Sequence, residues 1–110
     1  MHYLPSPEQT RRMDTAELRD RFLVPGLFVP GRTTLRFVDL DRVVLGGIVP
    51  TDGAVRLEAP AEMAAEFFLE RREAGVLNVG GPGRIVADGA EHAMARLDGL
   101  YLGRGTREAA

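Results

Sequence analysis

The sequence lacks both cysteine and lysine, and each absence excludes a class of chemistry. Without cysteine, disulfides and thiolate metal sites are excluded. All 14 basic residues are arginines, and the formal net charge is -2. The arginines are scattered along the chain, so the sequence carries no basic footprint for nucleic acid. Ser6 is the only serine and lies between two prolines, which argues against a serine hydrolase.

Long apolar segments are missing as well. No apolar run approaches the roughly 18 residues that span a bilayer. Pro5 and Pro7 interrupt the N-terminal stretch, which has no apolar region of a signal peptide. The 110 residues, 45% hydrophobic and 27% charged, suit one globular domain. We therefore expect a cytoplasmic protein with no membrane partner.

Helical signals are confined to the first quarter of the chain and to one later stretch. Residues 1–13 show little periodicity and predict an irregular arm. Asp14 and Glu17 match a capping box, which predicts one short helix over residues 15–21. Residues 60–66 are rich in alanine and glutamate and begin with proline, which favours a helical turn or two.

The rest of the chain alternates between apolar stretches and turn signals, a pattern typical of an all-β sandwich or barrel. Gly46 and Gly47 lie inside one apolar run and indicate a bulge or a close backbone approach. Asp88-Gly89 predicts a hairpin turn. The expected strands are residues 33–38, 42–49, 54–57, 67–73, 76–79, 84–87 and 100–105.

Metal-binding and phosphate-binding patterns are weak. The two histidines, His2 and His92, lie far apart in sequence and have no ligand-spaced partner, so surface histidines and no metal site are expected. The glycine-rich run at residues 80–83 contains Pro82, which removes a backbone N–H, and no lysine follows. A turn is therefore favoured there over a phosphate cradle.

The densest charged cluster is Glu70-Arg71-Arg72-Glu73. On a strand, alternate residues share a face, so each face would carry one carboxylate and one guanidinium. The cluster is therefore our candidate for lining a polar cavity or a subunit interface. The alternative is a solvated strand with cross-strand ion pairs. No catalytic residue is identified.

Several stretches together resemble one family. They are residues 18–24, Asp41 to Pro50, Phe68 to Gly83 with Asp88-Gly89, and Leu100 to Gly105 with Glu108. They are similar to the N-terminal part of the 4-deoxy-L-threo-5-hexosulose-uronate ketol-isomerases, also called 5-keto-4-deoxyuronate isomerases. The resemblance implies a cupin-like β-barrel or sandwich over residues 14–110. It also implies the N-terminal half of a bicupin, incomplete at its C-terminal edge.

The metal-binding residues of the cupin motifs are not present. Glu73 and Gly80 match the second part of the first motif, but its histidine positions hold Glu66 and Phe68, or Phe67 and Leu69. In the second motif, Glu108 stands at the histidine position. No zinc is therefore expected on this chain, although Glu66, Glu73, His92 and Glu108 are the donors left if a metal were bound. The resemblance places zinc in the C-terminal half of the full-length enzyme.

The resemblance implies an enzyme that converts 5-dehydro-4-deoxy-D-glucuronate to 3-deoxy-D-glycero-2,5-hexodiulosonate in pectin and polyuronate degradation. This half is expected to be scaffold and oligomer interface, inactive alone. Its partners are then the C-terminal half, further copies of the enzyme and the sugar-acid substrate. The alternative is a metal-free module that dimerises or binds a sugar acid through Arg72 or Arg84.

Overall fold

The computed structural model describes residues 2–110 and divides the chain into two compact units. The first unit ends at Val55, and the second runs from Arg56 to Ala110. Strands predominate, with few helices, which agrees with the expected all-β class. The strands are paired two by two, all antiparallel, and within residues 2–110 they do not close into a barrel.

The first unit begins with two short helices, α1 (Pro7–Thr10) and α2 (Thr15–Phe22). The Asp14–Glu17 capping box is confirmed at α2, where each side chain accepts from the other residue's backbone N–H. Helix α1 corrects the expectation of an irregular arm over residues 1–13, because the N-terminal part has two short helices and not the one expected. Its own capping box, Ser6 with Gln9, was readable from the sequence.

His2, within the expected irregular arm, is hydrogen-bonded to a strand. The backbone N–H of His2 donates to Phe37, and the carbonyl of His2 accepts from Asp39 at 3.1 Å. The ring Nε2 of His2 lies 2.5 Å from the carbonyl oxygen of Arg21, so this nitrogen carries the proton. His2 therefore connects α2 to the end of β1 (Thr33–Phe37).

Strand β1 pairs with β2 (Val44–Ile48), and a backbone segment crosses the pair closely at Gly47. A Cβ on Gly47 would lie 2.1 Å from the carbonyl oxygen of Leu27. Only glycine leaves room for that backbone. Opposite Gly47, Thr34 is buried. The predicted close approach is therefore confirmed, and it packs residue 27 onto the hairpin.

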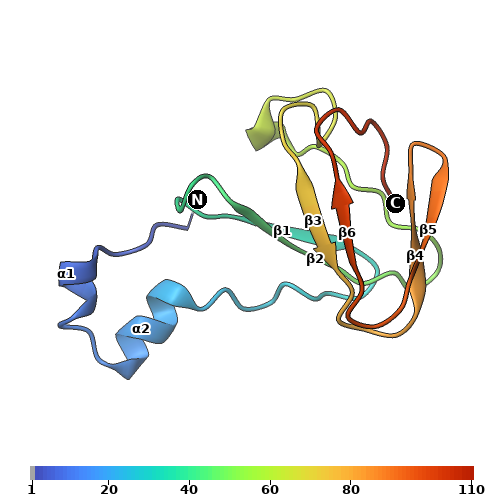
Figure 1. Cartoon of the computed structure of the whole chain (residues 1–110). Coiled ribbons are helices and arrows are strands. Elements are labelled where there is room, and N and C mark those ends of the chain that lie inside the picture. Colours follow the sequence, from blue (N-terminus) through green and yellow to red (C-terminus); the bar gives the residue numbers. More distant parts are fainter. Residues whose placement is uncertain (1) are drawn as a thin grey trace. The chain divides into compact units, whose positions relative to one another are not determined.

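The second unit contains a 3-10 turn, η1 (Ala61–Met63), and four strands: β3 (Ala74–Leu77), β4 (Gly83–Ala87), β5 (Ala90–Met94) and β6 (Gly99–Leu102). β3 pairs with β6, and β4 with β5 across the predicted Asp88-Gly89 turn (Figure 1). Positive φ angles at Asp88 (48°) and Gly89 (82°) fit a type I′ turn.

The core of the second unit lies between these strands and the end of the chain. Its buried members are Leu69, Ala87, Leu102 and Ala109. Ala109 lies opposite Ala87 in an antiparallel bridge, and Ala110 exchanges two backbone hydrogen bonds with Val86. On its other side, the Ala109 carbonyl accepts from the N–H of Leu57 at 2.8 Å. Residues 108–110 therefore lie between β4 and residue 57.

Two sequence expectations are wrong, because residues 54–57 and 67–73 form no strand. In place of a ladder, the first stretch makes one backbone hydrogen bond, from the N–H of Leu57 to the carbonyl of Ala109. The second folds back on itself around Leu69, which is 1% exposed. The helical turn expected within residues 60–66 is confirmed as η1, a 3-10 turn. No helix in the described part of the chain is long and apolar enough to cross a membrane.

Neighbouring glycines of β2 give a matched test of the close approach. Gly47→Ala should lower the free energy of unfolding by about 2–3 kcal/mol, because its Cβ meets backbone that must move. Gly46→Ala should cost less than about 1 kcal/mol, because the nearest neighbour of its Cβ is the flexible end of Leu35, at 3.1 Å, and the backbone oxygen of Thr34 lies at an ordinary contact distance of 3.7 Å. Chemical denaturation measures both variants, and equal losses would contradict the packing described.

Candidate functional site

The charged cluster lies at one end of the second unit, where two irregular segments meet. Leu69 packs into the core, and its carbonyl accepts from the N–H of Gly105 at 2.7 Å. Gly105 has a φ of 93°, in the region that favours glycine. This bond holds the segment before β3 against the segment after β6.

Residues 70–73 belong to the irregular segment that leads into β3, not to a strand. Glu70 and Arg72 are half-buried, whereas Arg71 and Glu73 are exposed. The expected alternation therefore persists without a sheet ladder. A role of the four residues in a cavity or an interface stays a prediction.

Local hydrogen bonds shape this segment. The carboxylate of Glu70 accepts from the backbone N–H of Glu66 at 2.9 Å, and Arg71 donates to the carbonyl of Ala64 at 3.4 Å. Ala64 itself has a φ of 48° and ends η1. Such side-chain bonds satisfy the backbone in place of a strand partner, which explains why the segment folds back.

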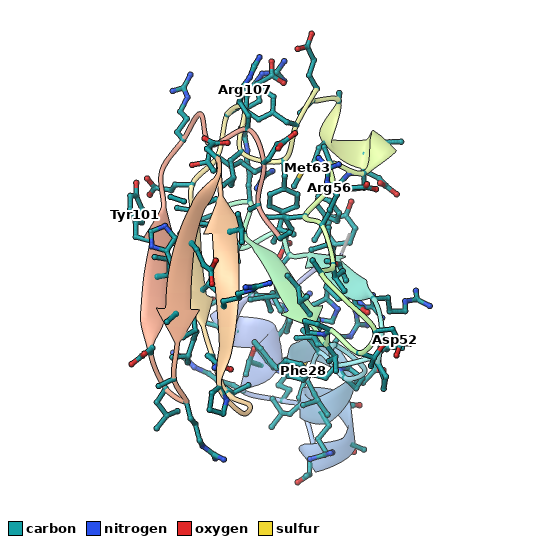
Figure 2. All side chains as sticks on the ribbon, turned by 90° about the vertical axis from the view of Figure 1, so that its right-hand side faces the viewer. Phe28, Asp52, Arg56, Met63, Tyr101 and Arg107 are labelled. Atoms are coloured by element: carbon teal, nitrogen blue, oxygen red, sulfur yellow. The ribbon has the colours of Figure 1, made fainter. Side chains whose placement is uncertain are left out.

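Glu73 reaches β6. Its Oε2 accepts from the hydroxyl of Tyr101 at 2.5 Å. This hydrogen bond needs the protonated phenol, and together with slight desolvation and the carboxylate charge it raises the pKa of Tyr101. The pair joins the charged cluster to the outward face of the β3–β6 sheet, where Tyr101 projects from its strand (Figure 2).

Arginines at this end are engaged with neighbours. The guanidinium of Arg107 lies 4.9 Å from the centre of the Phe67 ring, a cation–π geometry. Arg56 pairs with Glu108 at 3.4 Å, and both side chains are mostly exposed. On the β4–β5 hairpin, Arg84 pairs with Glu91 at 3.1 Å. Arg84, one of the expected sugar-acid ligands, therefore already has a carboxylate partner.

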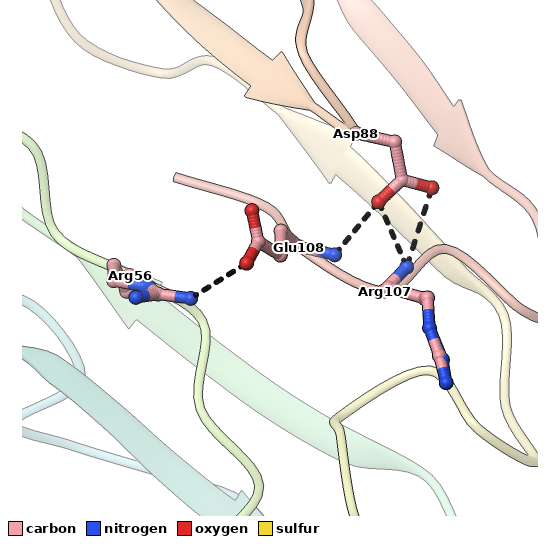
Figure 3. Close-up of polar contacts among 4 residues, drawn as sticks. All are labelled: Arg56, Asp88, Arg107 and Glu108. Carbon is pink, nitrogen blue, oxygen red and sulfur yellow. Dashed lines mark hydrogen bonds and ion pairs between the residues drawn. The ribbon is translucent and has the colours of Figure 1, made fainter.

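The carboxylate of Asp88 organises the end of the chain (Figure 3). Its Oδ1 accepts from the backbone N–H groups of Arg107 at 3.0 Å and Glu108 at 2.9 Å. The N–H of Asp88 donates in turn to the carbonyl of Glu108, at 2.9 Å. One turn residue therefore fixes the register of residues 107–110 against β4. Sequence reasoning identified Asp88 as a turn residue but did not predict this role, because its partners lie 19 and 20 residues away.

Metal donors are not grouped in the described residues. No cluster of three or more histidine, aspartate or glutamate side chains suited to a metal occurs within residues 2–110. Glu66, Glu73, His92 and Glu108 are therefore not brought together as a ligand set. The described residues therefore do not fit zinc.

An open cleft of about 260 Å³ lies in the first unit. It is lined by His2, Arg19, Asp20, Leu23, Val24, Pro25 and Arg36. Its walls come from α2, the segment after it and β1. Arg36 donates to the carbonyl of Leu35, its own strand neighbour. None of the candidate site residues lies here, and His2, which lines the cleft, was expected to be a surface histidine.

The Tyr101–Glu73 bond predicts a pH dependence. Because the phenol pKa is raised, the contact is present below the ordinary tyrosine value of about 10 and is lost as the pH rises through the raised value. In a Tyr3→Phe background only Tyr101 titrates, and Glu73→Gln should lower its pKa in the tyrosinate absorbance. Glu91→Gln is the control. An unchanged titration in Glu73→Gln would contradict the assignment.

The Asp88 contacts predict a stability difference between two substitutions. Asp88→Ala should lower the free energy of unfolding by about 1–2 kcal/mol, because two backbone N–H groups lose their acceptor. Asp88→Asn should remain close to the native value, since its Oδ1 still accepts and asparagine tolerates a positive φ. The two variants are compared by urea denaturation. A stable Asp88→Ala variant would contradict the role of the carboxylate.

Comparisons with known proteins agree with the resemblance read from the sequence. No protein-family model matches the chain. It is 42% identical over 106 residues to the 4-deoxy-L-threo-5-hexosulose-uronate ketol-isomerase of Lacticaseibacillus paracasei, and 40% identical over 109 residues to that of Opitutus terrae. It is 52% identical over 103 residues to that of Kineococcus radiotolerans.

These matches cover nearly all of this chain but a minor part of each relative. They include 94–98% of the chain and only 37–40% of the relatives' length. The expected resemblance is confirmed at this level. The chain is therefore similar to the 4-deoxy-L-threo-5-hexosulose-uronate ketol-isomerases over nearly its whole length, and it spans a little over a third of theirs.

Proposed function

We propose that this chain forms the N-terminal part of a ketol-isomerase. The enzyme would convert 5-dehydro-4-deoxy-D-glucuronate to 3-deoxy-D-glycero-2,5-hexodiulosonate in the degradation of pectin and other polyuronates. The observation that carries the proposal is the 52% identity to the Kineococcus radiotolerans ketol-isomerase over 103 residues. Identity at that level over a continuous segment is evidence of common descent rather than of a shared composition.

In this proposal the chain is scaffold and interface, and the zinc is held by the remainder of the enzyme. The dispersal of carboxylates and histidines in residues 2–110 supports that division. The cluster Glu70-Arg71-Arg72-Glu73 would then position neighbouring polypeptide rather than react with substrate. Its bonds to Ala64, Glu66 and Tyr101 support a structural role.

We further propose that these strands belong to a cupin-type β domain, which is one half of a bicupin. The antiparallel pairs β1–β2, β3–β6 and β4–β5 support this, because a cupin is built from such pairs. The outer edge of β5 has no partner strand among the described residues. Free edges of this kind favour pairing with further copies of the enzyme.

The test replaces the matched segment of the Kineococcus radiotolerans relative with this chain. We expect the chimera to isomerise the uronate, and the 110-residue chain alone to show no turnover. The control is the same relative without its matched segment, which should be inactive. A folded chimera without turnover would contradict the proposed function, and so would turnover by the isolated chain.

A further inference from the structure

The two sheets of the second unit have outward faces of different chemistry. On β4–β5, Arg84 and Glu91 point outward and form an ion pair at 3.1 Å. The other face of this hairpin buries Ala87 and Met94. That distribution is usual for an antiparallel sheet with one face in water.

The β3–β6 sheet departs from that distribution. Its inward residues, Ala74, Val76, Leu100 and Leu102, pack in or against the core. Its outward positions within the strands are also without charge: Gly75 lies opposite Tyr101, and Leu77 lies opposite Gly99. Leu77 is 61% exposed and Tyr101 is 66% exposed.

The apolar face continues past the ends of the strands. The N–H of Asn78 donates to the carbonyl of Asp98 and its carbonyl accepts from the N–H of Leu97, and the side chains of Val79 and Leu97 next to these residues are both exposed. The Asn78 amide also donates to the carbonyls of Gly81 and Met94, so this end is held in place. We call Leu77, Val79, Leu97 and Tyr101, with Gly75 and Gly99, the outer β3–β6 face.

Leu97 adds a second observation. Its φ is 68°, a conformation that bulky residues rarely adopt, and its side chain is 66% exposed. An apolar side chain is thus presented to solvent at a position where glycine or asparagine would be less strained. The turn from Ala95 to Asp98 holds Leu97 in this conformation, because the N–H of Asp98 donates to the carbonyl of Ala95 at 3.1 Å and the N–H of Ala95 donates to the Asp98 carboxylate at 2.8 Å.

We infer that the outer β3–β6 face is the docking surface for the ketol-isomerase polypeptide that lies outside the matched segment. The inference rests on the proposed function. The relatives carry most of their length outside the matched 37–40%, so polypeptide of sufficient size exists to cover the face. A face whose strand positions carry no charge, with the Glu73 carboxylate bonded to Tyr101 at its edge, suits permanent burial inside one protein better than transient contact with a charged partner.

The test introduces one pair of substitutions into the active chimera and into the isolated chain, and compares their effects on the Tm. Leu77→Asp with Leu97→Asp places carboxylates on the outer β3–β6 face, and Ala93→Asp places one beside Arg84 on the polar face of β4–β5. In the active chimera, the pair should lower the Tm by roughly 5 °C or more, because the charges become buried. In the isolated chain, where the face is in water, the pair should change the Tm by less than about 2 °C. Ala93→Asp should act alike in both.

Three outcomes would overturn the docking surface. Equal Tm changes in both contexts would do so, and the activity of the unmodified chimera would still test the proposed function separately. Dimerisation of the isolated chain that the pair abolishes, seen by sedimentation, would assign the face to a second copy instead. If the isolated chain does not unfold cooperatively, hydrogen exchange on the chimera replaces the Tm comparison. Burial of the outer β3–β6 face predicts that the amides of β3 and β6 exchange more slowly than those at the edge of the β4–β5 hairpin. Equal protection would refute the burial.

Discussion

The second unit depends on the backbone pairing between residues 108–110 and β4. Ala109 is 9% exposed and contributes to the core only because the end of the chain lies between β4 and residue 57. Asp88 fixes that position with its own N–H and with its carboxylate. Without this pairing, Ala87 and Leu69 would lose a neighbour on the side away from β5, and the β4–β5 hairpin would be an isolated pair of strands, which is marginal in water.

The first unit depends in a similar way on one backbone contact, that of Leu27 with Gly47. The carbonyl of Leu27 occupies the space that a side chain at residue 47 would fill. The chain between α2 and β1 is thereby packed on the hairpin although it has no regular structure. His2 supplies a second connection, from the end of β1 to the last turn of α2. A small unit with few buried side chains is thus held mainly by backbone contacts.

Features with a local cause were predictable from the sequence, and features with a distant cause were not. The Asp14 capping box and the Asp88-Gly89 turn each depend on residue types at short spacing. The glycine pair at residues 46 and 47 indicated a close approach, but not that residue 27 would make it. Residues 67–69 are apolar enough to suggest a strand, but their burial comes from folding back beneath Gly105. The Tyr101–Glu73 bond of the candidate site joins residues 28 apart, a distance at which spacing gives no signal.

In the second unit, the β4–β5 hairpin lies in sequence between the paired strands β3 and β6, and this order determines which strands can pair first. β4 and β5 are adjacent in sequence, so their hairpin closes a very short loop and forms at low entropic cost. The pairing of β3 with β6 encloses that hairpin and closes a longer loop. Residues 108–110 are synthesised after β4, β5 and β6 and complete the other edge of β4. During synthesis, β4 therefore has an open edge until its final neighbour emerges, which makes this strand the point most exposed to mispairing.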